Sequence, residues 1–210
     1  MMIRKFDKHL FLKSYFFLIL GIFLTIFLIF ALVSYPHTYD FFVGDRVVKE
    51  HISEVVGDTN SSHETALAIM EWHHENVRYP LVENKKYLFA GSNGLYEVDN
   101  KTRLFLRSNS ASWVIKTELA RCGESAHYFM DVMENKGYKS RVIRTEPLSW
   151  DHVWAEYYDE RGNKIVVDPS ANKVILDKNA WVAGKDITMI IATDIDGNKE
   201  DITKEYLEES

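Results

Sequence analysis

The longest apolar run of the chain lies near its N-terminus. Residues 14–39 contain no Asp, Glu, Lys or Arg, and Thr25 is the only strongly polar side chain at the centre of the run apart from the Tyr15 hydroxyl. A helix needs about 20 apolar residues to cross a bilayer, whereas the hydrophobic region of a signal peptide has roughly 7–15. We therefore predict an uncleaved transmembrane helix at residues 14–35.

Basic residues on the two sides of this run predict its orientation. Four precede the run closely, and the nearest ones that follow are farther away: Arg4, Lys5, Lys8 and Lys13, then Arg46 and Lys49. Because basic residues favour the cytoplasmic side, residues 1–13 are expected in the cytoplasm and the C-terminal part outside a cell membrane crossed once. Residues 36–60 are expected as a juxtamembrane stalk with a short helix near 47–56.

Two later segments have helical periodicity. Ser61, followed by Glu64 three residues on, predicts a capped helix start. Its expected buried face comprises Ala66, Ile69, Met70, His73 and Val77. A second helix is predicted at residues 122–135, where an apolar stripe ends before Gly137: Ala126, Phe129, Met130 and Met133.

Strand patterns dominate the C-terminal half. They are predicted at residues 140–143, 152–158, 164–168 and 187–193, and a further hairpin at 94–98 and 103–106 lies before the second helix. The predicted fold is therefore α+β, with an antiparallel sheet packed on the helix that begins at Cys122. Residues 61–210 are expected to form this single domain.

Composition limits the classes of partner. Residues 36–210 hold 21 basic and 30 acidic residues, a formal charge of −9, which argues against nucleic-acid binding and favours a protein or peptide substrate. Cys122 is the only cysteine of the chain, so no disulfide within the chain can form. A buried structural thiol and a reactive nucleophile are the two alternatives for it.

Three residues in this order suggest nucleophilic catalysis. Cys122 is at a predicted helix start, where unpaired N–H groups favour a thiolate. His152 and Asp168 lie on opposite arms of a predicted hairpin, and pairing about Glu160 would place them face to face. His152 would then exchange the proton with the thiol while Asp168 orients the imidazole. Each residue alone has an ordinary structural explanation, but the three together predict a catalytic triad.

No metal site or cofactor is predicted. His73 and His74 are adjacent, so their rings would point about 100° apart on a helix. Asp194, Asp196 and Asn198 have part of the spacing of a calcium loop, but the glycine comes too early, at Gly197, and a hairpin turn is the preferred interpretation.

Four segments together resemble the transglutaminase-like superfamily, over roughly residues 60–206. They are the helix that ends in Asn76-Val77-Arg78-Tyr79, then Arg121-Cys122-Gly123-Glu124, Asp151-His152-Val153-Trp154 and Val166-Val167-Asp168-Pro169. The second and third also resemble the peptide N-glycanase branch. The resemblance implies a papain-like domain with Cys122 as nucleophile, His152 as base and Asp168 as orienter. Glu124 and Trp154 match without an implied role, and Trp113 is the candidate for the oxyanion-hole aromatic residue.

The expected function is that of a membrane-anchored cysteine hydrolase, a peptidase or amidase, that cleaves an amide bond through a thioester acyl-enzyme. Two alternatives remain open at this stage. The thioester could be resolved by a lysine amine, giving a cross-linking protein-glutamine acyltransferase, or the domain could be a non-catalytic module that binds a peptide or partner protein.

Overall fold

The computed structural model describes residues 8–90, 92–147 and 151–207. The helices among them are α1 (Lys8–Val55), α2 (Ser62–Asn76), α3 (Ala111–Thr117), α4 (Cys122–Asn135), α5 (Lys178–Val182) and α6 (Thr203–Leu207), with 3₁₀ turns at Val82–Asn84 and Pro169–Ala171. The strands are β1 (Lys85–Ala90), β2 (Asn93–Val98), β3 (Lys101–Phe105), β4 (Ser140–Pro147), β5 (Val153–Tyr158), β6 (Lys164–Asp168), β7 (Lys173–Ile175), β8 (Ile187–Thr193) and β9 (Lys199–Asp201).

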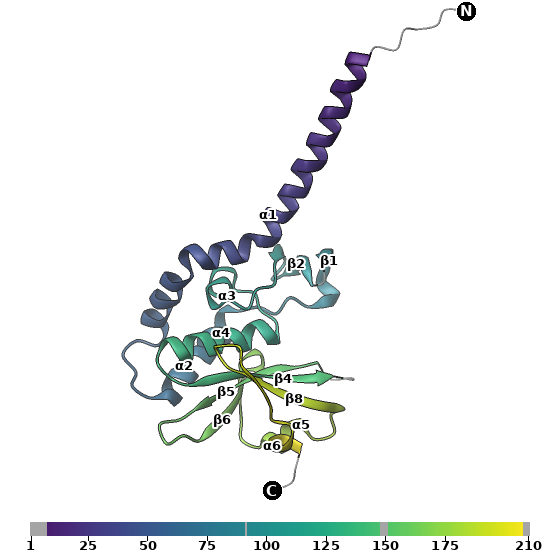
Figure 1. Ribbon diagram of the computed structural model, residues 1–210. Coiled ribbons are helices and arrows are strands. Elements are labelled where there is room, and N and C mark those ends of the chain that lie inside the picture. Colours follow the sequence, from purple (N-terminus) through teal and green to yellow (C-terminus); the bar gives the residue numbers. More distant parts are fainter. Residues whose placement is uncertain (1–7, 91, 148–150, 208–210) are drawn as a thin grey trace, which may run out of the picture.

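An antiparallel sheet in the order β7-β6-β5-β4-β8-β9 organises the domain, with α4 and α2 on one side and α5 and α6 on the other (Figure 1). Adjacent residues of a strand point to opposite faces. On β4, Val142 joins the core cluster under α4, and Ile143 joins the cluster under α5 and α6. The predicted α+β class, with the Cys122 helix on an antiparallel sheet, is confirmed.

The two predicted helical faces are buried as expected. On α4 the whole predicted stripe lies in the core: Ala126, Phe129, Met130 and Met133. On α2 the Ser61 side chain accepts a hydrogen bond from Glu64 N, and Ala66, Ile69, Met70 and His73 are buried. Both helices therefore present their apolar sides to the same core.

The register of β5 and β6 differs from the prediction. Ala155 pairs with Val167 and Tyr158 with Lys164, so the hairpin is centred one residue beyond Glu160. The cause is the turn, where Asp159 N donates to Asn163 O and Gly162 adopts a positive φ of 81°. Each residue of β5 therefore pairs with a β6 residue two positions farther along than predicted. A shift of two residues keeps each side chain on its predicted face of the sheet.

Helix α1 is 48 residues long, contains Pro36, and changes direction after its straight first part (Figure 1). Pro36 lacks an N–H group and its ring clashes with the preceding turn, which explains the bend. Before it, Tyr15–Leu32 has a mean hydropathy of 2.8 and none of this stretch is buried. Among the described residues this is the one stretch apolar and long enough to cross a membrane.

Residues 36–60, expected as a stalk, instead pack on the domain. Val48 and Val56 belong to the core under α4, and His51 Nε2 shares a buried hydrogen bond of 2.7 Å with Tyr128 OH. Gly44 is buried where α1 passes α3, and a Cβ there would meet the Asp40 carboxylate of its own helix at 2.5 Å and lie in ordinary contact with Ser112 Oγ at 3.4 Å. The predicted short helix near 47–56 is the end of α1.

A second sheet, in the order β1-β2-β3, contains the hairpin predicted at residues 94–106 and one additional strand. Its inner face is held by a cluster of Tyr96, Val98, Phe105 and Leu119. The additional strand, β1, was not predicted because its sequence does not alternate between apolar and polar residues, and residues 85–89 are all exposed.

A buried ion pair joins β4 to β5 on the α6 side of the main sheet. Arg141 Nε donates to Glu156 Oε2 at 2.8 Å, and Tyr206 on α6 also donates to this carboxylate. Glu156 is fully buried. Removal of one partner of such a pair leaves an uncompensated buried charge.

We predict that Arg141→Met lowers the free energy of unfolding by about 3–5 kcal/mol, because Glu156 would keep its charge without its cation. Urea denaturation of the full chain in detergent measures this change. Arg161→Met, in the exposed turn after β5, is the matched control and is expected to change stability by less than about 0.5 kcal/mol. Equal stability of the two variants would contradict the role of the buried pair.

Candidate active site

Cys122 is the first residue of α4, and the side chain of the preceding residue, Arg121, holds this helix start in place. The Arg121 guanidinium donates to Pro80 O, to Ser92 Oγ at 2.8 Å and to Tyr96 OH at 3.1 Å, and it lies over the ring of Phe105. These contacts join the helix start to the small sheet. The N–H groups of the first helical turn have no acceptor inside the helix, so they are available to an anion beside Cys122.

Glu124 completes this helix start. Its buried carboxylate accepts from Arg121 N through Oε2, at 3.2 Å, and from Arg107 Nε through Oε1, at 2.6 Å. A carboxylate in the first helical turn is also favoured by the helix dipole. Glu124 thus has a structural role as a cap, which the sequence left unassigned.

The structure brings the predicted His152 and Asp168 together. His152 Nε2 and Asp168 Oδ2 are 2.8 Å apart, although the shifted register places the two residues diagonally rather than opposite each other. Hydrogen bonds between His152 and Thr145 tie the residue to the end of β4. The second ring nitrogen, Nδ1, is not used in this contact, and Cys122 is close enough to raise the pKa of the imidazole.

Asp168 is buried, and several donors surround its carboxylate. Oδ1 accepts from Ser170 N at 3.0 Å, from Ser170 Oγ at 2.7 Å and from Ala171 N at 3.3 Å. Burial alone would raise the pKa of Asp168, but the hydrogen bonds from His152 and Ser170 hold it below the usual value. Asp168 is therefore an anion next to the imidazole. Ser170 was not singled out from the sequence.

The environment of His152 favours the imidazolium form. Burial lowers its pKa, but hydrogen bonds with Asp168 and Cys122 outweigh that effect and raise the pKa to about 9. Two other histidines behave in the opposite way: burial lowers the pKa of His51 and of His73 to about 4. His152 thus differs from the buried histidines around it because it has anionic partners.

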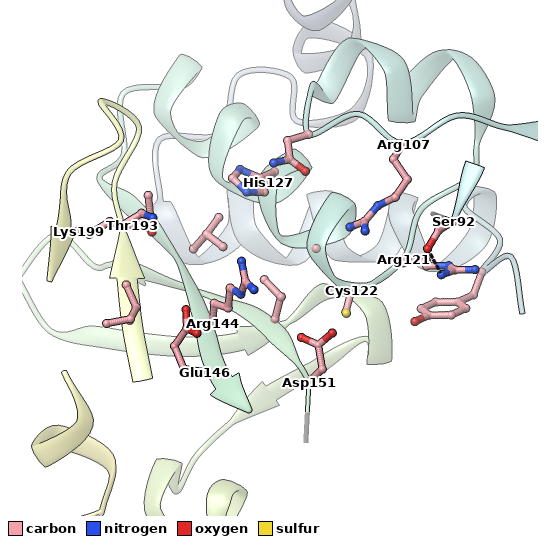
Figure 2. A pocket seen from close by; sticks show the side chains of 16 residues that line it. Ser92, Arg107, Arg121, Cys122, His127, Arg144, Glu146, Asp151, Thr193 and Lys199 are labelled. Carbon is pink, nitrogen blue, oxygen red and sulfur yellow. Dashed lines mark hydrogen bonds between the residues drawn. The ribbon is translucent and has the colours of Figure 1, made fainter. Parts of the chain in front are cut away.

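A cleft of about 510 Å³ opens over the start of α4. Figure 2 shows Cys122 at this cleft, with Arg107 and Asp151 on either side and Arg144 and Glu146 along β4. Charged and polar side chains make up most of the wall, together with Val142, Val153 and Ile191 from the main sheet. The cleft is open to water, so a substrate can reach Cys122 from the solvent.

Tyr79 is a site residue that the sequence did not reveal. It lines the same cleft, and its side chain lies near Cys122. Its position follows from a parallel bridge between Arg78 and Leu119, in which Arg78 N donates to Glu118 O and Ala120 N to Arg78 O. Burial and the neighbouring thiol raise the pKa of Tyr79, so it keeps its proton. No local spacing predicts such a contact between distant segments.

Trp113, the expected oxyanion-hole candidate, does not line the cleft, and this prediction is wrong. Its Nε1 donates to Leu106 O at 2.7 Å, and its ring packs against Tyr35 and Tyr39 of α1. Trp154, which matched the family motif, is fully buried and donates to Tyr206 OH. Neither indole is therefore available to a substrate in this cleft.

The histidine pair and the acidic loop have structural roles. His73 is buried and shares a hydrogen bond of 2.9 Å with Ser125 Oγ on α4, whereas His74 is exposed. The Asp194 carboxylate accepts from both the backbone and the side-chain amide of Asn198, which closes the turn between β8 and β9. The preferred interpretation of this loop as a hairpin turn is confirmed.

Comparison with known proteins agrees with this geometry. The family model described as the transglutaminase-like superfamily matches residues 50–183, more than half of the chain. A Yarrowia lipolytica protein (strain CLIB 122 / E 150) described as a peptide-N(4)-(N-acetyl-beta-glucosaminyl)asparagine amidase is 29% identical over 131 residues. That match covers 60% of this chain and 35% of the relative, so the chain spans about a third of the relative's length. The expected resemblance to the glycanase branch is confirmed.

Solved structures with a similar fold are more distant. Rad4–Rad23 crosslinked to undamaged DNA has a TM-score of 0.46 at 16% identity, over 68% of this chain and 36% of that one. A candidate cysteine protease from Cytophaga hutchinsonii has a TM-score of 0.42 at 19% identity, over 75% of this chain and 48% of that one.

We predict that Asp168→Asn lowers the pKa of His152 from about 9 toward the ordinary imidazole value of about 6.5, because the anionic acceptor is lost. Histidine NMR titration of the full chain in detergent micelles measures this value. In the unmodified protein, His152 stays protonated at neutral pH and loses its proton as the pH rises through about 9. A titration that is the same in both proteins would contradict the pairing. Asp159→Asn, in the exposed turn, is the control.

Proposed function

The chain belongs to the transglutaminase-like superfamily, and on this premise we propose that it is a membrane-anchored cysteine hydrolase that cleaves an amide bond in a peptide or protein. Family membership and the amidase relative support an enzyme of the cysteine hydrolase type. The observation that carries the proposal is the 2.8 Å hydrogen bond between His152 and Asp168 beside Cys122, whose side chain lines the cleft.

Acylation begins with the thiolate of Cys122. Its sulfur attacks the amide carbonyl carbon, a C–S bond forms, and the π electrons of the carbonyl move onto oxygen. When the C–N bond breaks, the imidazolium of His152 transfers the Nδ1 proton to the departing nitrogen, and a thioester remains on Cys122. Asp168 keeps the imidazole oriented and stabilises its charged form throughout this step.

The oxyanion of this step has two sources of donors. Backbone N–H groups at the start of α4 have no helical acceptor, and the Tyr79 hydroxyl reaches Cys122 from the opposite segment. Removal of one such donor typically slows catalysis about 10²–10³-fold. Tyr79 thus takes the role for which Trp113 was the candidate.

Water completes the reaction. His152, now neutral, accepts a proton from water through Nδ1 as the oxygen attacks the thioester carbon, and the C–S bond then breaks. The products are a carboxylic acid and the regenerated thiolate–imidazolium pair. The open cleft with its charged wall supports water as the acceptor, because a transferase that uses a lysine amine must exclude water from its thioester.

Anchoring is the second part of the proposal. No residue of the apolar stretch Tyr15–Leu32 is buried in the protein, as expected for a helix surrounded by lipid. The basic residues that precede it support a cytoplasmic N-terminus and a domain outside the membrane. The substrates would then be proteins or peptides on that side.

We predict that the full chain converts peptide or glycopeptide amides into carboxylic acids, and that a Cys122→Ala variant does not. Mass spectrometry of the digests measures the products, and a thioester on Cys122 that hydroxylamine removes would identify the intermediate. Amine-linked products in the presence of a lysine peptide would establish transfer instead. Turnover that persists in Cys122→Ala would refute thiol catalysis, and binding without turnover would indicate a non-catalytic module.

We predict that Tyr79→Phe lowers kcat by about 10²–10³-fold with little change in KM, because the hydroxyl acts on the oxyanion rather than on the bound substrate. Tyr138→Phe, which removes a hydroxyl after the other end of α4, is the matched control and is expected to retain the unmodified kcat. An equal kcat for Tyr79→Phe and the unmodified protein would contradict the assignment of this donor.

A further inference from the structure

The outer face of the small sheet carries an apolar row whose central residue, Leu95, is half-buried and whose outer members are exposed. Tyr87 on β1 pairs with Leu95 on β2, and Leu95 pairs with Leu104 on β3, so the three side chains cross the sheet on one face. Tyr87 and Leu104 are exposed, and so is Phe89 at the outer end of β1. The opposite face is the one filled by the Tyr96 cluster.

A second apolar pair lies on α1 directly after its bend. Phe41 and Phe42 are 84% and 75% exposed, whereas Gly44 and Val48, three and seven residues after Phe41, are buried. Two adjacent phenylalanines that are this exposed gain nothing from the domain core. Exposed apolar patches of this kind mark contact sites.

The small sheet and the Phe41–Phe42 pair are both connected to the part of α1 that follows the apolar stretch Tyr15–Leu32. The Trp113 ring packs against Tyr35 and Tyr39 of α1, while Trp113 Nε1 donates to Leu106 O, one residue beyond β3. Lys116 also donates to Tyr35 OH. Figure 1 shows β1 and β2 at the end of the domain from which the straight part of α1 departs.

We propose that the outer face of the β1–β3 sheet, together with Phe41 and Phe42, rests on the membrane surface beside the α1 span. This inference depends on the proposed anchoring and not on catalysis. The bilayer is the occupant because the apolar stretch Tyr15–Leu32 leads into this surface without a linker. Aromatic residues are favoured at the boundary between lipid and water, and Lys85 at the start of β1 suits lipid headgroups, whereas Lys86 is paired with Glu97 at 3.3 Å.

The docked surface would determine which substrates reach the cleft. Ser92, between β1 and β2, lines the cleft. Its Oγ accepts a hydrogen bond from the Arg121 guanidinium, which anchors the start of α4. Contact of this sheet with lipid therefore holds Cys122 close to the membrane. The substrates that fit such a site are amides in peptide segments near the membrane surface.

Single-probe fluorescence tests this docking in the full chain. In a Cys122→Ala background, Tyr87→Cys and Phe42→Cys each carry an environment-sensitive NBD label, and the protein is incorporated into phosphatidylcholine vesicles. Leu176→Cys, at an apolar residue that is 96% exposed near α5 at the other end of the domain, is the matched control. Flotation with the vesicles separately tests the anchoring.

We expect blue-shifted emission at positions 87 and 42 that nitroxide-labelled lipids quench at least about twofold more than emission at position 176. Water-like emission at positions 87 and 42 in chains that float with the vesicles would overturn the docking while leaving the anchor intact. Blue-shifted emission that the nitroxide lipids do not quench would indicate a protein partner or a second copy, and would also overturn it. Chains that fail to float would refute both anchoring and docking.

Discussion

The buried carboxylate of Asp168 is the interaction on which the site depends. A charge without partners inside a protein costs several kcal/mol, and each hydrogen bond to a charged group returns about 1.5–3 kcal/mol. Asp168 receives such bonds from Ser170 and from His152. The carboxylate can stay charged only while the turn after β6, which holds Ser170, and the start of β5, next to His152, keep their positions. The electrostatic state of His152, and through it that of the thiol, is thus determined by the local geometry of the sheet.

Local patterns predicted the elements that carry the site. The Cys122 helix and the strands at residues 164–168 and 187–193 have the bounds expected from the sequence, because apolar periodicity and flanking turn residues define them. The parity of His152 and Asp168 was also predictable, since a register shift of two residues preserves the face. The shift itself was not, because it depends on the five-residue turn closed by Asp159.

Contacts between distant segments could not be predicted in this way. Tyr79 reaches Cys122 through a bridge between residues that are about forty positions apart, and Trp113 is turned away from the cleft by its contacts with α1. Residues 36–60 were assigned to a stalk because their pattern is mixed, yet Val48 and Val56 complete the core under α4. Helix α1 therefore contributes to the domain as well as to the expected anchor, and His51 links it to α4 through Tyr128.

The rate of Cys122 alkylation by iodoacetamide, followed from about pH 4 to about pH 9 on the full chain in detergent, tests the central claim most directly. Since Cys122 is the only cysteine, every adduct reports on this site. The account predicts that His152→Ala slows alkylation at neutral pH at least about tenfold, because the imidazolium beside Cys122 is lost. Equal alkylation rates in the two proteins at every pH would contradict it.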